Sequence, residues 1–322
     1  MTFLEYIDMI EITRDTVVTM GNFDGLHLGH MQLIKKAVRI GKRENLESIA
    51  FTYDIHPLNF LYSKSVHLLM SKEDKDSILH SRGIDRVLHV PFDEEIRGMS
   101  SEEFCDIILV KKLRAKHLVM GEDAKFGKDK QDINHIKEYC EKRGIEVHVI
   151  PLLIMDDKRV SSSHIRKLVE RGDIESANRY LGRMYSVEGT VVHGKKLGRK
   201  LGYPTANLYI DSEKAVPARG VYETEVEIEG NVFIGATNVG NNPTVGDKTL
   251  RVETYLVGFE GDLYGRTIKI RFIRRLRNEL KFDSVEELIE QMSKDVKNII
   301  ENRSKPELFI SFLYKCGAPH SI

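Results

Sequence analysis

The 322-residue sequence predicts two domains of different class, an α/β domain with a doubly wound parallel sheet followed by an antiparallel β domain. Three observations support this prediction. The chain is longer than a single hydrophobic core usually serves. Strand-like and helix-like patterns alternate from residue 16 to about 181, and short strands separated by glycine, asparagine and proline follow after Arg183. We therefore expect domains at 1–183 and 184–322.

The first domain is expected to have parallel strands with helices on both faces of the sheet. Apolar, β-branched runs predict strands at 16–20, 48–53, 86–91, 117–120 and 147–153. Apolar residues at helical spacing predict helices at 29–43, 71–82, 101–114 and 132–143, and two shorter ones near 161–171 and 173–181. Ser71, Ser101 and Asp132 stand where these helices should begin.

The second domain has the alternating pattern of short antiparallel strands. They are expected at 185–192, 221–228, 232–236, 251–257 and 267–272, with turn residues between them. A helix at about 284–300 and a tail at 306–315 complete the sequence. This pattern is compatible with a barrel and with a sandwich.

The overall composition excludes several classes of function. Lys+Arg and Asp+Glu both number 49, so no net charge attracts nucleic acid or an anionic membrane. The longest apolar runs are too short for a bilayer span, and residues 1–8 lack the basic start of a secretory leader. Cys105, Cys140 and Cys316 are scattered, which is typical of a reducing cytoplasm and offers no disulfide or metal-ligand spacing.

The segment 21–30, Gly-Asn-Phe-Asp-Gly-Leu-His-Leu-Gly-His, joins a predicted strand to a predicted helix. A helix N-terminus attracts phosphate through its unpaired N–H groups and partial positive charge. The glycines let a ligand approach the backbone, and His27 and His30 add two donors. A capped turn without function is the alternative, and a zinc site would lack a third ligand at useful spacing. The segment therefore predicts binding of a nucleoside triphosphate.

A second set of polar residues, at 161–166, precedes another short predicted helix. Three serines are followed by Arg166, whose guanidinium can pair with phosphate oxygens in a bidentate manner. Helix capping alone explains the serines equally well. Together with the histidine turn, the segment predicts a contact to the far end of the triphosphate.

In the second domain, Thr205 and Asn207 follow Pro204 in an extended segment. Both side chains then point the same way, so that a hydroxyl and an amide oxygen could share one magnesium ion. A solvated basic loop and an RNA-binding patch are the alternatives for residues 194–207. Glu253 lies on the face of its strand opposite the apolar residues, and its spacing alone does not make it a base.

In combination, these motifs resemble those of the bifunctional bacterial FAD synthetases, in which riboflavin kinase and FMN adenylyltransferase form one polypeptide. The resemblance covers nearly the whole chain. It rests on 21–30, 54–57, 121–123, 126–127, 161–166, 198–199, 202–208, 220–222, 238–244, Glu253 and 262–265. It implies a Rossmann-like nucleotidyltransferase domain of the HxGH type, followed by a riboflavin kinase β-barrel with a C-terminal helix.

The resemblance also implies a reaction and its residues. ATP phosphorylates riboflavin to FMN, and a second ATP adenylylates FMN to FAD with release of pyrophosphate. The implied catalytic residues are Glu253, as the kinase base, and His27, His30 and Arg166 for adenylyl transfer. The implied ATP-binding residues are Gly21, Phe23, Asp24, Gly29, Ser161, Ser162, Ser163, Gly194, Lys195, Gly202 and Pro204. Flavin contacts are implied for His56, Pro57, Asp123, Phe126 and Asn238, and Mg²⁺ ligation for Thr205 and Asn207.

Two departures from the family pattern leave an alternative open. Ala124 occupies a position where the family has an aromatic residue, and Ile55 one where proline is frequent. A riboflavin kinase with an impaired adenylyltransferase domain would fit both. A nucleic-acid-binding or regulatory protein using the basic stretches 195–200 and 271–281 is disfavoured by the zero net charge. We expect ATP, riboflavin and FMN as the partners, with no nucleic acid, membrane or obligate protein partner, in the cytoplasm.

Overall fold

A computed structural model describes residues 1–61, 66–125, 127–194, 202–241 and 250–303. The chain forms two compact units, which are described separately. Unit 1 comprises Met1–Val66 and Ser71–Ser161, and unit 2 comprises His67–Met70 and the chain from Ser162 onward. The predicted boundary after residue 183 stays a prediction. Among the described residues, no helix has both the length and the apolar character needed to cross a membrane.

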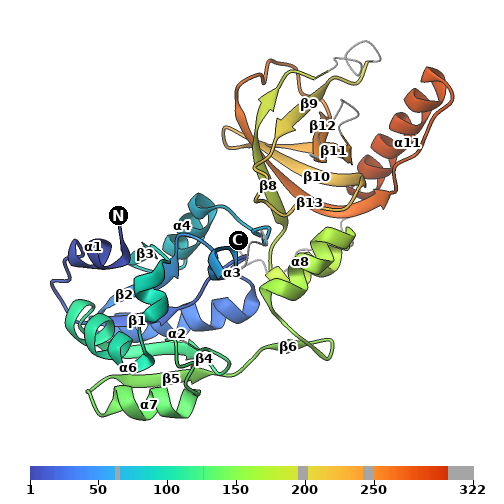
Figure 1. Cartoon of the computed structure of the whole chain (residues 1–322). Helices are drawn as coiled ribbons and strands as arrows, with labels where there is room; N and C mark the ends of the chain where they lie inside the picture. Colours follow the sequence, from blue (N-terminus) through green and yellow to red (C-terminus); the bar gives the residue numbers. More distant parts are fainter. Residues whose placement is uncertain (62–65, 126, 195–201, 242–249, 304–322) are drawn as a thin grey trace. The chain divides into compact units, whose positions relative to one another are not determined.

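Unit 1 is built on a parallel sheet with the strand order β3-β2-β1-β4-β5 (Figure 1). The strands are β1 (Thr16–Met20), β2 (Glu47–Tyr53), β3 (Arg86–Val90), β4 (Ala115–Gly121) and β5 (Glu146–Ile150). The predicted doubly wound sheet is confirmed. The prediction that β5 continues to residue 153 is wrong. The Leu153 carbonyl accepts a hydrogen bond from Val160 N–H instead, next to the short hairpin of β6 (Ile154–Met155) and β7 (Lys158–Arg159).

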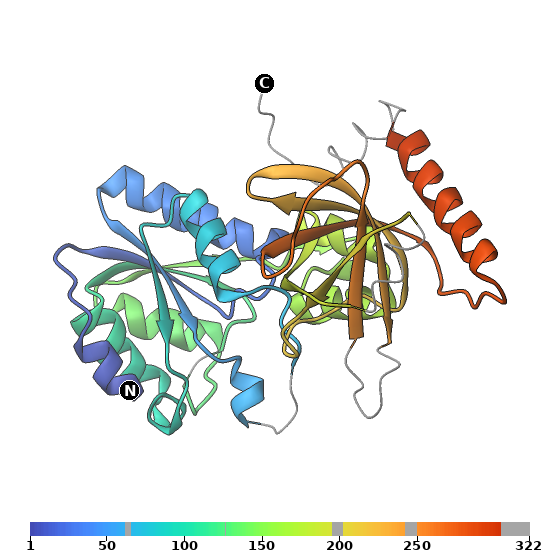
Figure 2. The same cartoon turned by 90° about the horizontal axis from the view of Figure 1, so that it is seen from above.

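Helices cover both faces of this sheet (Figure 2). One face packs against α2 (Leu28–Glu44), where Gly41 lets the helix approach Val17 of β1. The other face carries Val18, Ile49, Phe51 and Leu118 into the main core. That core is completed by α1 (Phe3–Asp8), the π-helix η1 (Phe104–Lys112) and α7 (Ile133–Glu141). Further helices of unit 1 are α3 (Pro57–Leu61), α4 (Lys72–Ser81), α5 (Glu94–Gly98) and α6 (Ser101–Glu103).

The three predicted helix starts are confirmed. Ser71 accepts a hydrogen bond from Asp74 N–H, and Asp132 accepts from Asn134 N–H. Helix α6 begins at Ser101, as predicted, and Ser100 and Glu103 form a capping box at its start. The predicted regular helix beyond Ser101 continues as a π-helix whose last N–H, that of Leu113, bonds to the Ile108 carbonyl.

Two of the cysteines lie side by side in the core of unit 1. The sulfurs of Cys105 and Cys140 are 3.1 Å apart, and both residues are buried. Both are free cysteines, as expected, and their spacing in the sequence gave no sign of this contact, because η1 and α7 bring together residues that are far apart in the chain. Cys316 lies outside the described residues.

Unit 2 contains a closed barrel with the strand order β10-β11-β12-β9-β8-β13. The strands are β8 (Tyr185–Val192), β9 (Thr205–Tyr209), β10 (Gly220–Ile228), β11 (Asn231–Asn241), β12 (Leu250–Leu256) and β13 (Thr267–Arg277). The structure thus decides for a barrel over a sandwich. Closure depends on β9, which the sequence indicated only as an extended segment.

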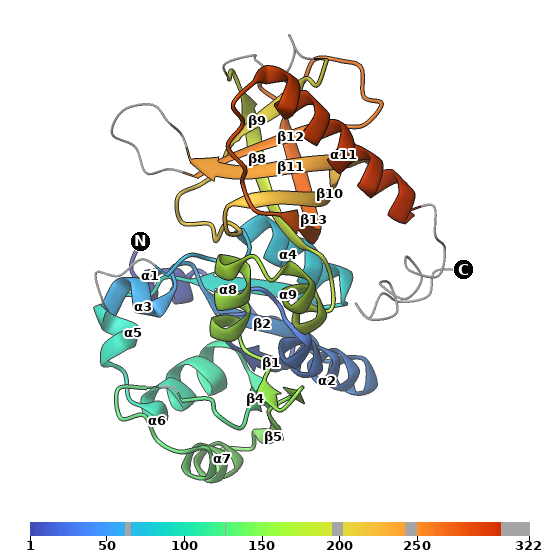
Figure 3. The same ribbon diagram turned by 90° about the vertical axis from the view of Figure 1, so that its right-hand side faces the viewer.

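Among the described residues of unit 2, three helices accompany the barrel. The predicted short helices are α8 (Ser162–Arg171) and α9 (Ile174–Leu181), which pack against each other. The long helix α11 (Val285–Arg303) lies along the outside of the barrel next to β11 (Figure 3). The predicted tail at 306–315 lies outside the described residues.

A chain of buried hydroxyls crosses three neighbouring strands inside the barrel. Thr224, Thr237 and Thr254 are all 0% exposed. The Thr237 hydroxyl lies 2.8 Å from that of Thr224 and donates to that of Thr254 at 2.9 Å. Each hydroxyl therefore has its partner within the chain, as a buried polar group requires.

Replacing the central hydroxyl should destabilise the barrel. Thr237→Val keeps the volume but takes the hydrogen-bond partner from the two outer hydroxyls, which should lower the free energy of unfolding by about 1–3 kcal/mol. Urea unfolding measures this change. The matched control is Thr190→Val at an exposed position of β8, where we expect less than about 0.5 kcal/mol. Equal effects at the two positions would contradict the hydroxyl chain.

Candidate functional site

The turn between β1 and α2 holds the two predicted histidines. His27 is the N-cap of α2, and its Nδ1 accepts a hydrogen bond from His30 N–H at 3.2 Å. The two rings are stacked with their centroids 3.6 Å apart. Because Nδ1 accepts, a neutral His27 carries its proton on Nε2, where it can donate to a bound anion. The predicted strand–turn–helix arrangement is present.

Two glycines make room for the aromatic rings of this turn. A Cβ on Gly29 would lie 3.2 Å from the His27 ring, and a Cβ on Gly21 would lie 3.2 Å from the Phe23 ring. Phe23 is buried and packs edge-on against His30. Its side chain therefore packs under the turn as part of the core. The expected contact of Phe23 with ATP stays a prediction.

Lys75 of α4 adds a cation to this turn that sequence reasoning missed. Its Nζ donates to the Asn22 carbonyl at 2.9 Å. Burial lowers the pKa of Lys75, and the nearby carboxylates of Asp24 and Asp76 oppose that shift. Asp24 is itself buried. No motif could have indicated Lys75, since it lies in an ordinary polar helix and reaches the turn only through the fold.

Two of the predicted flavin contacts of unit 1, His56 and Asp123, lie outside its helices and strands. His56 precedes α3, which begins at Pro57, and its Nδ1 accepts from Leu58 N–H at 3.2 Å. Asp123 forms an ion pair with Arg159. Ala124 packs against the main core, and Phe126 lies outside the described residues.

The serine–arginine segment divides between the two units. Ser161 ends unit 1, whereas Ser162, Ser163 and Arg166 belong to α8 in unit 2. The Arg166 Nε donates to the His67 carbonyl at 2.6 Å. That Arg166 and the histidine turn contact the same triphosphate therefore stays a prediction.

In unit 2, strand pairing aligns three polar side chains on the outer face of the barrel. Val252 and Thr254 are 0% exposed inside the barrel, so Glu253 between them points outward. The register places Glu253 opposite Asn207 on β9 and opposite Asn238 on β11. Directly opposite residues share a face, so the three side chains form one row.

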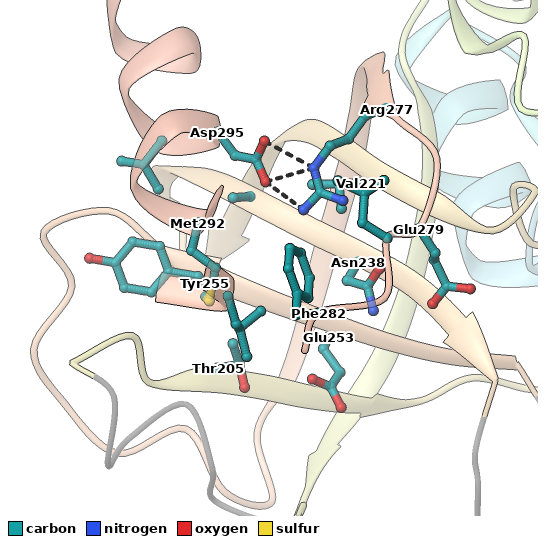
Figure 4. A pocket seen from close by; sticks show the side chains of 14 residues that line it. Thr205, Val221, Asn238, Glu253, Tyr255, Arg277, Glu279, Phe282, Met292 and Asp295 are labelled. Atoms are coloured by element: carbon teal, nitrogen blue, oxygen red, sulfur yellow. Dashed lines mark hydrogen bonds and ion pairs between the residues drawn. The ribbon is translucent and has the colours of Figure 1, made fainter. Parts of the chain in front are cut away.

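A cavity of about 330 Å³ lies over this row (Figure 4). Glu253 and Asn238 line it from the strands, and Phe282 and Met292 line it from the segment that leads into α11 and from α11 itself. The ion pair of Arg277 with Asp295, 2.7 Å between Nη2 and Oδ2, fastens α11 to β13 at one end of the cavity. The volume lies within the range of small-molecule sites, of roughly 300–1,000 Å³.

A second cavity, of about 270 Å³, adjoins the first. Gly194, Pro204, Asn207 and Tyr264 line it, and Thr205 lines both cavities. The residues predicted for the kinase site therefore line one or both of these cavities, with the exception of two predicted ATP contacts. Lys195 lies outside the described residues, and Gly202 lies in an exposed turn with φ +81°.

The donor atoms around Asn207 fit a hard cation. Its Oδ1 is buried and has no hydrogen-bond partner in the part of the chain that the structure describes. Mg²⁺ prefers oxygen ligands of this kind. A Cβ on Gly194 would collide with the Asn207 amide and lie 2.5 Å from Arg251 Nη2. Arg251 in turn forms an ion pair with Glu253, with 2.6 Å between Nε and Oε1.

The basic stretch at 271–281 is largely neutralised in the structure. Ion pairs join Arg271 to Glu227 and Arg274 to Glu223. The guanidinium of Arg277 is paired with Asp295, as described above. The stretch thus offers little unpaired charge to a phosphate backbone, which removes support from the nucleic-acid alternative. The stretch at 195–200 lies outside the described residues.

Comparisons with known proteins match both halves of the chain. The family described as FAD synthetase matches residues 9–164, and the family described as riboflavin kinase matches residues 181–302. The chain is 36% identical over 294 residues to the bifunctional riboflavin kinase/FMN adenylyltransferase of Buchnera aphidicola subsp. Schizaphis graminum, covering 89% of this chain and 94% of that protein. The protein of the same name from Listeria monocytogenes is 35% identical over 283 residues, covering 87% and 90%.

A solved structure resembles the whole fold. It is the crystal structure of a protein named as a macrolide-efflux protein from Streptococcus pneumoniae. The TM-score is 0.85 at 30% identity, with 90% of this chain and 95% of that chain covered. The similarity extends the sequence comparison to three dimensions over both units.

The capping role of His27 can be separated from its chemistry. Asparagine is a good N-cap and alanine is a poor one, so His27→Ala should be less stable than His27→Asn by about 1 kcal/mol. Both variants lose the imidazole, and the difference in their urea midpoints therefore reports the cap alone. Identical midpoints would mean that the hydrogen bond from His30 N–H contributes nothing to stability.

Proposed function

Because the chain belongs to the bifunctional riboflavin kinase/FMN adenylyltransferase family, we propose that it makes FMN from riboflavin and ATP, and FAD from FMN and a second ATP. Phosphorylation is assigned to unit 2 and adenylyl transfer to unit 1. The observation that carries the kinase assignment is the row of Asn207, Glu253 and Asn238 beside two cavities that meet at Thr205.

In the kinase reaction, Glu253 is the proposed general base. Riboflavin in the larger cavity presents its terminal ribityl hydroxyl to the γ-phosphate of ATP in the smaller one. The hydroxyl oxygen forms a bond to phosphorus, the bond to the ADP oxygen breaks, and the proton passes to the Glu253 carboxylate. Arg251 holds that carboxylate in place through their ion pair. Such a base contributes about a hundred- to ten-thousand-fold in rate.

Thr205 and Asn207 are the proposed ligands of the magnesium ion that accompanies ATP. The unpartnered Asn207 Oδ1 supports this assignment, since a buried acceptor without a donor is costly unless a cation binds there. A bound Mg²⁺ would neutralise charge on the phosphates. Gly194 is required beside it, because a side chain at that position would displace the Asn207 amide.

Adenylyl transfer requires no general base, because its nucleophile is the anionic FMN phosphate. That phosphate attacks the α-phosphate of ATP, and pyrophosphate leaves. The proposed work of unit 1 is to position the phosphates and to stabilise charge, through His27, His30 and the N-terminus of α2. Lys75 supplies further positive charge at the same turn. Arg166 is proposed to assist at the leaving pyrophosphate.

The departures at Ala124 and Ile55 do not remove every apolar surface near the predicted flavin contacts. Leu58, Phe60 and Leu61 on α3 are 38–44% exposed, and Phe60 packs edge-on against Phe92. This surface next to His56 is a candidate platform for the flavin ring. We therefore propose the bifunctional enzyme over a riboflavin kinase with an impaired first domain. We further propose that it acts in the cytoplasm, without an obligate protein partner.

A product assay tests the proposal directly. The purified chain, given riboflavin and Mg-ATP, should accumulate FMN and then FAD in chromatograms. When FMN replaces riboflavin, FAD and pyrophosphate should form in equal amounts. Formation of FMN from riboflavin, with no FAD from either substrate, would support the kinase-only alternative. Absence of any phosphorylated flavin would reject the proposal.

Single substitutions should separate the two activities. Glu253→Gln keeps the size of the side chain but removes the base, so FMN formation should fall about a hundred- to ten-thousand-fold while FMN-to-FAD conversion stays within about twofold. His30→Ala should have the opposite effect. Rates measured with each flavin substrate report both steps. Loss of both activities in either folded variant would contradict the assignment of one reaction to each unit.

A further inference from the structure

A cluster of metal-ligating side chains lies in unit 1, at the sheet edge opposite the glycine–histidine turn. His117 stands near the start of β4, and Glu146 and His148 stand at the start of β5. The parallel register pairs His117 with Glu146 and Val119 with His148, so all three side chains share one face of the sheet. His27, by contrast, follows the carboxyl end of β1.

The distances within the cluster match those of a tetrahedral site. His117 Nδ1 and His148 Nε2 are 3.0 Å apart. Oxygens of Glu146 lie 3.6 Å from His117 Nδ1 and 3.5 Å from His148 Nε2. Zn²⁺ with bonds of about 2.0–2.1 Å holds tetrahedral ligand atoms about 3.3 Å from one another. The two ring nitrogens are close to this spacing, and each has one Glu146 oxygen near it, Oε2 for His117 and Oε1 for His148.

A fourth residue, Glu44, contacts the ring nitrogen of His117 that points away from the cluster. His117 Nε2 lies 2.7 Å from Glu44 Oε2, at the end of α2. With its proton on Nε2 and donated to this carboxylate, His117 turns the lone pair of Nδ1 toward the cluster. Histidines that bind metals almost always donate their other N–H to a carboxylate, a carbonyl or water. The partial negative charge at the C-terminus of α2 also favours a cation there.

An ordinary hydrogen bond accounts for only part of this arrangement. Without a metal, His148 Nε2–H would donate to His117 Nδ1, and this bond satisfies the two ring nitrogens that face each other. It does not require Glu146, whose side chain is 62% exposed and yet lies within 3.6 Å of both histidine nitrogens. A cation that replaces the proton between the two histidines would account for the contact between the rings and for both contacts of Glu146.

We propose that His117, Glu146 and His148 bind one Zn²⁺ ion, and that Glu44 positions His117 for it. Two imidazoles and one carboxylate are a known zinc ligand set, and they disfavour Mg²⁺ and Ca²⁺, which prefer oxygen. The exposure of Glu146 leaves an approach from solvent, with water as the fourth ligand. The ion joins β4 to β5, and its site is separate from the flavin chemistry.

Metal binding to the full-length chain tests this proposal. Protein freed of metal by a chelator is dialysed against Zn²⁺ in the presence of excess Mg²⁺, and its metal content is measured by mass spectrometry. We expect one Zn²⁺ per chain, lost in His148→Ala and in Glu146→Gln. Calorimetry should show affinity about 10- to 100-fold weaker in Glu44→Gln. The matched control is His135→Ala, where a single histidine lies 3.2 Å from Glu102, and it should bind zinc like the wild type.

Two further measurements separate the site from a folding effect. Co²⁺ should give visible absorption bands of a tetrahedral complex in the wild type and not in His148→Ala. Zinc should raise the melting temperature of the wild type and of His135→Ala, and should leave those of His148→Ala and Glu146→Gln unchanged. FMN and FAD formation should be unchanged, within about twofold, in His148→Ala. Stoichiometric zinc in that variant, or none in the wild type, would overturn the proposal, whatever the outcome of the flavin assays.

Discussion

The pairing register of β12 is the constraint on which the site in the barrel depends. A shift of one residue would turn every side chain of a strand to the other face. Inside the barrel, Thr254 is held in the chain of buried hydroxyls, and this places Glu253 outside, level with Asn207 and Asn238. The interior hydrogen bonds and the exterior carboxylate are therefore two consequences of one register. The stability of the barrel and the proposed catalysis by Glu253 are linked through this register.

In the proposed scheme, the two units meet different chemical demands with different structural features. An alcohol must lose its proton in order to attack phosphorus, and the Glu253 carboxylate beside the cavity would accept it. An anionic phosphate needs no base, and the backbone N–H groups at a helix start, two histidines and a lysine of unit 1 would stabilise its charge. His27 serves this unit twice, because the ring nitrogen that caps α2 also fixes the proton on the opposite nitrogen.

Periodicity predicted most of the fold, because each strand and helix of this chain carries its pattern locally. The glycine–histidine turn and the Thr205–Asn207 pair were also readable from adjacent residues. The features missed were those formed by residues far apart in sequence. Lys75 reaches Asn22 from another helix, Cys105 meets Cys140 across the core, and barrel closure depends on β9, whose polar residues look like a loop. No local pattern carries such information.

The two proposed metal sites of this chain differ in the type of ligand atom, and this difference can direct two different ions to them. The proposed magnesium ligands in unit 2 are oxygens of Thr205 and Asn207, whereas the amino edge of unit 1 offers imidazole nitrogens and one carboxylate. Imidazole suits zinc, and hydroxyl and amide oxygens suit magnesium. Zinc would therefore be withdrawn from the kinase site by a better ligand set in the same polypeptide. Excess magnesium, in turn, would not displace it from His117 and His148.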